Sequence, residues 1–225
     1  MAEFQRGKFP LFIRRFVTGI FEENTWFIRD EESGMTALVD PGEAVDEMLD
    51  DSGLLGDKPL DRVLLTHAHI DHVWGLSAVK QRWPKVEIRM HRDDLELLRA
   101  LPRQGAMVGM PLPLPPAPEP DLFVGDGERF TFGKRSVEVI HTPGHTKGGI
   151  CYLFDTGDLF LGDMIISGSV GRTDLPGGDP TKMKASLLRL TRLDPDIWIY
   201  GGHGPQSRLG DEMKTNAVLP HLGSL

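Results

Sequence analysis

The sequence predicts a layered α/β protein, and two patterns support this fold class. Short runs rich in β-branched and aromatic residues alternate with helical segments, as in proteins whose sheets are covered by helices. Histidine and aspartate residues directly follow several of the β-rich runs, and loops at strand ends commonly build functional sites.

The first half of the chain predicts a meander of strands that passes into alternating strands and helices. Asn24 and Gly34 lie in turn sequences of the meander, and Pro84 ends a predicted helix. The predicted strands cover residues 11–17, 25–29, 36–39, 61–65 and 86–90, and the predicted helices cover residues 44–49, 73–82 and 93–99.

The second half is richer in strands. One amphipathic helix is expected over residues 181–193, because leucines at 187, 190 and 193 recur at helical spacing. The predicted strands cover residues 128–132, 136–140, 150–154, 159–161 and 196–200.

Residues 101–120 form a proline-rich segment with seven prolines. Proline lacks the backbone N–H and breaks helices, so we expect an extended loop. A loop this long is uncommon inside a compact domain unless it is functional or disordered, and Met107 and Met110 offer adaptable apolar contacts. A solvated connector and a substrate-covering lid are both open interpretations.

Length and charge limit the classes of function. The 225 residues suit a single domain over 1–225, and one cysteine excludes an internal disulfide. No apolar stretch reaches the roughly 20 residues of a membrane span, and Arg14 and Arg15 interrupt the apolar run near the start. The net charge of -8 disfavours nucleic acid as a partner. We therefore expect a cytoplasmic protein without nucleic-acid or membrane partners, and the oligomeric state stays open.

The segment T-H-A-H-I-D-H at residues 66–72 is the clearest chemical signal. His67, His69, Asp71 and His72 place four possible ligands within six residues, directly after an apolar run. A lone histidine is usually a surface or core residue, but this cluster predicts a metal site. Nitrogen and oxygen ligands without thiolates suit zinc or a similar ion in a site open to substrate.

A second set of ligands follows later strands. His145 lies in a turn after the strand at 136–140, Asp163 closes the apolar run at 159–162, and His203 follows the strand at 196–200. A glycine adjoins each of the three and lets the backbone turn sharply. The sequence therefore predicts enough ligands for two metal ions.

The ordered motifs T-H-A-H-I-D-H, T-P-G-H-T, L-G-D and G-G-H-G resemble the metallo-β-lactamase superfamily, and within it the glyoxalase II-like hydrolases. The resemblance spans residues 12–204 and implies a four-layer αββα sandwich with the metals at one edge of the two sheets. It implies that one metal is held by His67, His69 and His145, that the other is held by Asp71, His72 and His203, and that Asp163 bridges them.

The resemblance also implies a hydrolase. Two divalent ions, zinc first and iron or manganese as alternatives, would lie about 3.5–4 Å apart and activate a bridging hydroxide for attack on a thioester. Asp71 is the expected catalytic residue as well as a ligand. Cys151 lies in an apolar run and is expected to be a buried hydrophobic residue rather than a nucleophile.

Three further positions are interpreted more openly. Arg172 lies where glyoxalase II-like proteins hold glutathione, and the alternative is a surface arginine paired with Asp174. Asp40 either orients a ligating imidazole or caps a turn before Pro41. His91 and His141, which have no place in the ligand pattern, are expected to form local hydrogen bonds or cap a helix.

The predicted function is a thioesterase acting on a small acyl-glutathione. Only about twenty residues follow His203, so the chain is similar to the short bacterial type that lacks the C-terminal helical domain. The alternatives are a mononuclear iron persulfide dioxygenase, a lactone or β-lactam hydrolase, and a metal-binding module without catalysis.

Overall fold

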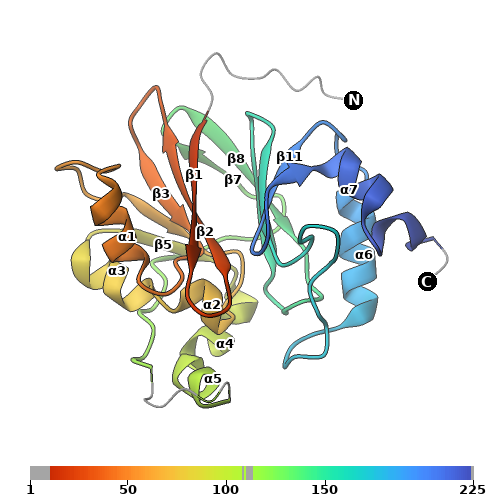
Figure 1. The fold of residues 1–225 in the computed structure, drawn as a ribbon, viewed down its shortest axis with the longest axis horizontal. Helices are drawn as coiled ribbons and strands as arrows, with labels where there is room; N and C mark the ends of the chain where they lie inside the picture. Colours follow the sequence, from red (N-terminus) through yellow and green to blue (C-terminus); the bar gives the residue numbers. More distant parts are fainter. Residues whose placement is uncertain (1–10, 108, 110–113, 224–225) are drawn as a thin grey trace.

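The computed structural model, in which residues 11–107, 109 and 114–223 are described, has two sheets packed face to face with helices on both outer faces. Figure 1 shows the four layers, with α1 and α3 outside the first sheet and α6 and α7 outside the second. The predicted αββα sandwich is therefore confirmed.

The first sheet contains six strands in sequential order. The first three strands are antiparallel neighbours and the later ones are parallel. The strands are β1 (Leu11–Thr18), β2 (Glu23–Asp30), β3 (Thr36–Val39), β4 (Arg62–Leu64), β5 (Glu87–Met90) and β6 (Leu122–Phe123).

The second sheet also contains six strands in sequential order, and its one parallel pair joins β10 and β11. The strands are β7 (Arg129–Phe132), β8 (Arg135–His141), β9 (Ile150–Phe154), β10 (Asp158–Gly162), β11 (Trp198–Gly201) and β12 (Ser207–Arg208).

The helices fill the outer layers and the loops at one end of the sheets. The α-helices are α1 (Val45–Ser52), α2 (Ile70–Val73), α3 (Leu76–Arg82), α4 (Leu95–Arg99), α5 (Leu101–Met107), α6 (Pro180–Leu190) and α7 (Leu209–Thr215). The 3₁₀ helices are η1 (Arg92–Asp94) and η2 (Leu219–His221). Asp179 caps α6 by accepting hydrogen bonds from the N–H groups of Thr181 and Lys182.

Alternation along the strands produces three apolar layers. In β9, Tyr152 and Phe154 face the first sheet, whereas Cys151 and Leu153 face the helices on the other side. In β3, Leu38 likewise faces α1 and α3 while its neighbours face the second sheet. Successive side chains of a strand point to opposite faces, so a strand buried on both faces is apolar throughout.

The structure corrects two predicted elements. The helix predicted over 73–82 is split into α2 and α3 at Gly75, whose N–H donates to Pro41 O and whose added Cβ would lie 2.1 Å from Gly42 O. The extended loop predicted over 101–120 is wrong at its start, because α5 occupies Leu101–Met107. Pro102 lies in the first turn of α5, where its missing N–H is not needed.

Several short elements near the ends of the sheets were not predicted, namely β6, β12, α7 and η2. Met110 and the rest of 110–113, part of the suggested lid, lie outside the described residues.

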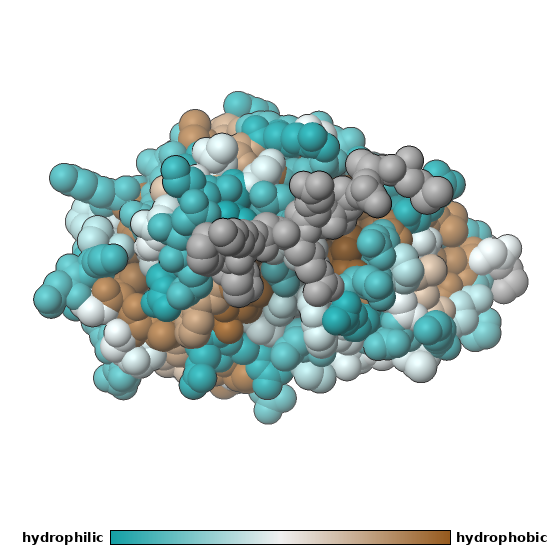
Figure 2. All heavy atoms as spheres, turned by 90° about the horizontal axis from the view of Figure 1, so that it is seen from above, coloured by the Kyte–Doolittle hydropathy of each residue, from teal (hydrophilic) through white to brown (hydrophobic). Residues whose placement is uncertain are grey.

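Helices α2, α4 and α5 and the β1–β2 turn gather at one end of the sandwich in Figure 1. Figure 2 views the opposite end, where hydrophilic residues are spread between separate hydrophobic areas. No helix among the described residues has the length and apolar character needed to cross a bilayer.

Candidate metal centre

The seven predicted ligands converge at the end of the sandwich where α2 lies. The ligand atoms of His67, His69 and His145 lie within 4.8 Å of one another, and those of Asp71, His72 and His203 form a second such group. The Asp163 carboxylate lies between the groups, with its oxygens 3.4 Å from His72 Nε2, 3.5 Å from His145 Nε2 and 3.6 Å from His203 Nε2. Residues separated by up to 136 positions thus form one cluster.

Hydrogen bonds on the outer side of the cluster fix the ring nitrogens. The Asp40 carboxylate accepts from Thr66 Oγ1 at 2.6 Å and lies 3.0 Å from His72 Nδ1. A carboxylate can only accept here, so His72 carries its proton on Nδ1. Thr66 Oγ1 uses its own proton toward Asp40 and therefore accepts from His67 Nδ1 at 3.0 Å. Both rings turn Nε2 toward the centre. Burial alone would lower the pKa of His72, but the Asp71 and Asp163 carboxylates raise it, so a cation that binds at His72 Nε2 would displace a proton there.

The hydrogen bond made by one ring nitrogen also identifies the metal-facing nitrogen of His145. Its Nδ1 lies 2.7 Å from the carbonyl oxygen of Arg172, which can only accept, so Nε2 carries a free lone pair. That atom lies 2.8 Å from His69 Nδ1. Two nitrogens at this separation can both reach one ion at the roughly 2.0–2.1 Å typical of zinc–imidazole bonds.

The cluster leaves buried polar atoms without partners. His67 Nε2, His72 Nε2 and Asp163 Oδ1 are among the buried side-chain atoms that have no hydrogen-bond partner in the described structure. Such atoms are costly when they are unsatisfied, so they are rare without a reason. Divalent ions bound by these atoms would satisfy them, and the donor set fits zinc, iron or manganese.

Burial and charge set the protonation states that metal binding needs. Burial strongly lowers the pKa of His67, and the neighbouring His72 adds to the effect. Burial also lowers the pKa of His69, so both imidazoles are neutral. Burial alone would raise the pKa of Asp163, but His72 holds it well below its usual range. Neutral imidazoles and an ionised carboxylate are the forms that bind cations.

Two glycines make the close packing possible. A Cβ added at Gly202 would lie 2.3 Å from Asp163 Oδ1 and 2.5 Å from the Cε1 atom of His72. A Cβ added at Gly171 would lie 2.1 Å from Asp163 O and 2.9 Å from His145 Nδ1. Any side chain at either position would displace a candidate ligand.

Asp94 joins two of the ligand loops, and the sequence interpretation did not identify it. Its buried carboxylate accepts from Ala68 N at 3.1 Å, Thr146 Oγ1 at 2.8 Å and Gly148 N at 2.6 Å. Ala68 adjoins two ligands and Thr146 adjoins His145. Only the acidic cluster at the start of η1 marks this position in the sequence, and that cluster indicates a helix start equally well.

Asn24 and Trp26 of β2 hold the loop that carries His203. Asn24 N donates to Gly202 O at 2.7 Å, and Asn24 Nδ2 donates to the carbonyls of Gly201 and Gly204. Trp26 Nε1 also donates to Gly201 O, at 3.0 Å. The first sheet therefore positions a ligand that belongs to the second.

A pocket of about 690 Å³ opens over the cluster. His69, Asp71, His145, Asp163 and His203 line its floor, and its walls are mainly apolar. One wall carries Phe21 of the β1–β2 turn with Leu97, Ala100 and Met107 of the α4–α5 region, and the other carries Ile166, Val170, Leu175 and Pro176. An apolar pocket with a few convergent polar groups is typical of a small-molecule site.

Gln104 fastens α5 to the first ligand loop. Its Oε1 accepts from Ile70 N at 3.0 Å, and its Nε2 donates to Ala68 O at 3.0 Å and to Leu97 O at 2.9 Å. The sequence interpretation missed this residue because it lies inside the segment predicted to be a loop.

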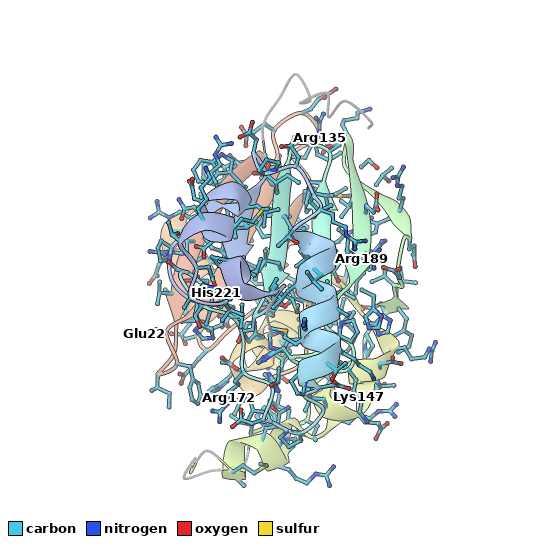
Figure 3. All side chains as sticks on the ribbon, turned by 90° about the vertical axis from the view of Figure 1, so that its right-hand side faces the viewer. Glu22, Arg135, Lys147, Arg172, Arg189 and His221 are labelled. Carbon is cyan, nitrogen blue, oxygen red and sulfur yellow. The ribbon has the colours of Figure 1, made fainter. Side chains whose placement is uncertain are left out.

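Arg172 lines the pocket, but its guanidinium forms two hydrogen bonds of 2.6 Å with the Asp174 carboxylate. Figure 3 shows Arg172 near the end of the molecule where α5 lies. The surface pair considered from the sequence is therefore present.

The other open positions have local partners. Asp40 contacts His72 as one of its two interpretations required. His91 Nδ1 accepts from Asp93 N and caps η1, and His141 Nε2 donates to Lys147 O. Cys151 is fully buried, and burial raises the pKa of its thiol to about 12, which confirms an inert hydrophobic role.

Comparison with known proteins agrees with this geometry. Residues 18–203 match the family model described as "Metallo-beta-lactamase superfamily". The chain belongs to this superfamily. Hydroxyacylglutathione hydrolase GloC of Haemophilus influenzae is 34% identical over 207 residues, which cover 88% of this chain and 93% of the relative.

Solved structures of superfamily members superpose closely. TTHA1623 in a di-iron-bound form is 33% identical, with a TM-score of 0.80 over 91% of this chain and 98% of that chain. BLEG-1 B3 metallo-beta-lactamase is 28% identical, with a TM-score of 0.83 over 92% of this chain and 99% of that chain. This superfamily member is thus a metallohydrolase with a histidine-rich candidate site.

Proposed function

We propose that this protein is a dinuclear metal-dependent thioesterase that acts on a small acyl thioester, preferably an acyl-glutathione. The convergence of seven candidate ligands, five of which line the floor of one pocket, carries the proposal. One ion would be held by His67, His69 and His145, the other by Asp71, His72 and His203, and Asp163 would contact both.

When bound, divalent ions supply a Lewis acid for the thioester carbonyl and lower the pKa of a coordinated water. Asp71 presents its carboxylate at the pocket floor, 3.3 Å from His203 Nε2. Burial alone would raise the pKa of Asp71, but His72 and His203 hold it below its usual value. The ionised Oδ2 can therefore accept a hydrogen bond from the attacking water and orient it.

The reaction adds water across the thioester. A C–O bond forms at the acyl carbon, the C–S bond breaks, and the released thiol takes up a proton. The apolar pocket walls suit an acyl chain and exclude bulk water from this step. The relative from Haemophilus influenzae, named as a hydroxyacylglutathione hydrolase, supports glutathione as the thiol. Arg172 lines the pocket but is paired with Asp174, so it would have to exchange that partner to bind a glutathione carboxylate.

Metal analysis combined with substrate assays tests the proposal. Two ions per chain under saturating zinc or manganese, with hydrolysis of S-lactoylglutathione, is the expected result. A persulfide dioxygenase would instead use one iron held by two histidines and one carboxylate, and would consume oxygen with glutathione persulfide. Hydrolysis of a lactone or a β-lactam, with no turnover of any thioester, would replace the proposed substrate class.

A further inference from the structure

The pocket over the metal centre contains two arginines among its described lining residues, and they differ in one respect. Arg172 is engaged by Asp174 through two hydrogen bonds of 2.6 Å. Arg103 also lines the pocket and is exposed, and its guanidinium has no ion pair or hydrogen bond with any other residue that the structure describes. Arg103 is therefore the pocket cation that is free to meet an anion.

The backbone of Arg103 is held by hydrogen bonds, whereas its guanidinium has no partner among the described residues. Its backbone N–H donates to Ala100 O at 2.8 Å, and the next residue, Gln104, ties α5 to the loop of metal ligands through two hydrogen bonds and to Leu97 of α4 through a third. The backbone of Arg103 is therefore positioned by the same loop that carries His69, and its exposed side chain is free to turn toward an anion in the pocket. Because the backbone is already fixed, only the side-chain rotamers of Arg103 have to be ordered when it binds.

The surroundings of Arg103 describe the ligand that it would take. Met107 lies four residues after it in α5 and so shares its helix face, and both Met107 and Ala100, the residue that ends α4, line the pocket. Met107 is 73% exposed and offers an apolar surface to a bound molecule. An apolar surface beside a free guanidinium fits a molecule with an apolar body and a carboxylate at one end.

We propose that Arg103 is the specificity-determining residue of this pocket, and that it selects thioesters bearing a carboxylate by pairing with that group. The inference rests on the proposed thioesterase function and specifies its substrate class. It assigns the role to α5, whereas Arg172 keeps its pair with Asp174. The anion is bound in the ground state and the transition state alike, so the effect falls on KM rather than on kcat.

Two substrates that differ in charge test the assignment. Arg103→Ala should raise KM for S-lactoylglutathione about threefold to fivefold, the upper part of the range expected for an exposed charged pair, and leave KM for the neutral S-acetyl-N-acetylcysteamine nearly unchanged. Arg103→Lys should restore most of the loss, because it keeps the charge. Added salt should raise KM for the anionic substrate in the wild type and much less in Arg103→Ala.

Arg99 provides the matched control. It lies four residues earlier, carries the same charge and is exposed, but it is engaged by Glu96 and Glu119 and does not line the pocket. Arg99→Ala should leave both KM values unchanged. An equal loss on both substrates in Arg103→Ala, or a larger charge-dependent loss in Arg172→Ala, overturns the proposal.

A thioether that cannot be hydrolysed separates this inference from the proposed function. S-hexylglutathione should bind the wild type in calorimetry and bind Arg103→Ala about fivefold more weakly, whether or not any thioester is turned over. If no thioester is hydrolysed but Arg103→Ala still binds S-hexylglutathione more weakly than the wild type, the thioesterase function is refuted and the anion site at Arg103 is supported. Equal binding by the two proteins removes the role of Arg103 even if thioesters are hydrolysed, and no binding to either removes it as well.

Discussion

Replacing Asp94 tests whether the two ligand loops depend on a single carboxylate. Asp94→Ala removes the acceptor of three hydrogen bonds and leaves the donors of Ala68, Thr146 and Gly148 buried. A hydrogen bond to a charged group contributes about 1.5–3 kcal/mol, and the cost of burying the carboxylate offsets part of the sum, so we expect a net loss of about 3 kcal/mol. For a chain of this size that corresponds to a fall in Tm of roughly 6–12 °C.

The metal centre should weaken along with the fold. The loops carrying His69 and His145 lose their common partner, so metal affinity should fall about 10-fold to 100-fold, as it does when groups that orient ligands are removed. Thermal melts of metal-free and metal-loaded protein, and metal titration monitored by calorimetry, measure the two effects. Asp93→Ala is the matched control, since the Asp93 side chain is 57% exposed. If the two variants have the same Tm and the same metal affinity, Asp94 does not join the loops.

The pH dependence of stability follows from the same residue. Burial raises the pKa of Asp94, and its hydrogen bonds with Thr146, Gly148 and Ala68 offset only part of the shift. Between the ordinary pKa and the raised one, the unfolded chain has lost a proton that the folded chain retains. Stability therefore falls as pH rises through this window and is higher below it. Asp94→Asn should remove this part of the slope in urea unfolding of metal-free protein.

Three further results are expected. Gly202→Ala should abolish binding of the second metal while Gly125→Ala, whose Cβ would meet nothing within 4 Å, should not, as measured by elemental analysis. Asp163→Ala should lower kcat by at least about 100-fold while Cys151→Ala stays within a few-fold, and equal losses in two folded variants would refute the assigned ligand. Gln104→Ala should speed hydrogen exchange in α5 and change the preference among acyl chain lengths, whereas an unchanged preference would show that α5 does not shape the pocket.

The fold class and the ligand candidates could be predicted because their signals are local. Alternation and composition mark β3, β8, β9 and β10 within four to seven residues each, and the structure places strands there. The candidate ligands at 67–72 are clustered after one strand, and the other three each follow a strand-like run and adjoin a glycine, so each is visible in a short window of sequence. That the seven ligands meet in one site is a nonlocal property of the chain. It was predicted from the family resemblance and not from the spacing of the residues.

The supporting residues could not be predicted because their roles exist only in the folded chain. Asp94 meets its partners across 26, 52 and 54 positions, and Asn24 meets Gly204 across 180. Nothing in the neighbourhood of either residue indicates these contacts. The helix α5 was missed for a different reason. The seven prolines over 101–120 predicted a loop for the whole segment, although six of them lie after Met107, where α5 ends.

The metal centre and the pocket wall are supported in different ways, and this difference affects which parts of the protein can change. The candidate ligands are tied to both sheets, through Asp40 and Asn24 from the first and through β8, β10 and β11 from the second, so a change in either sheet reaches the metals. The helix α5 contacts the ligand loop mainly through Gln104, and the face of α5 that lines the pocket carries Arg103 and Met107. Substitutions on that face alter what the pocket accepts without removing any hydrogen bond that orients a ligand. A conserved reaction and a variable substrate can therefore coexist in one fold, because loops on a rigid scaffold change at little cost to the scaffold itself.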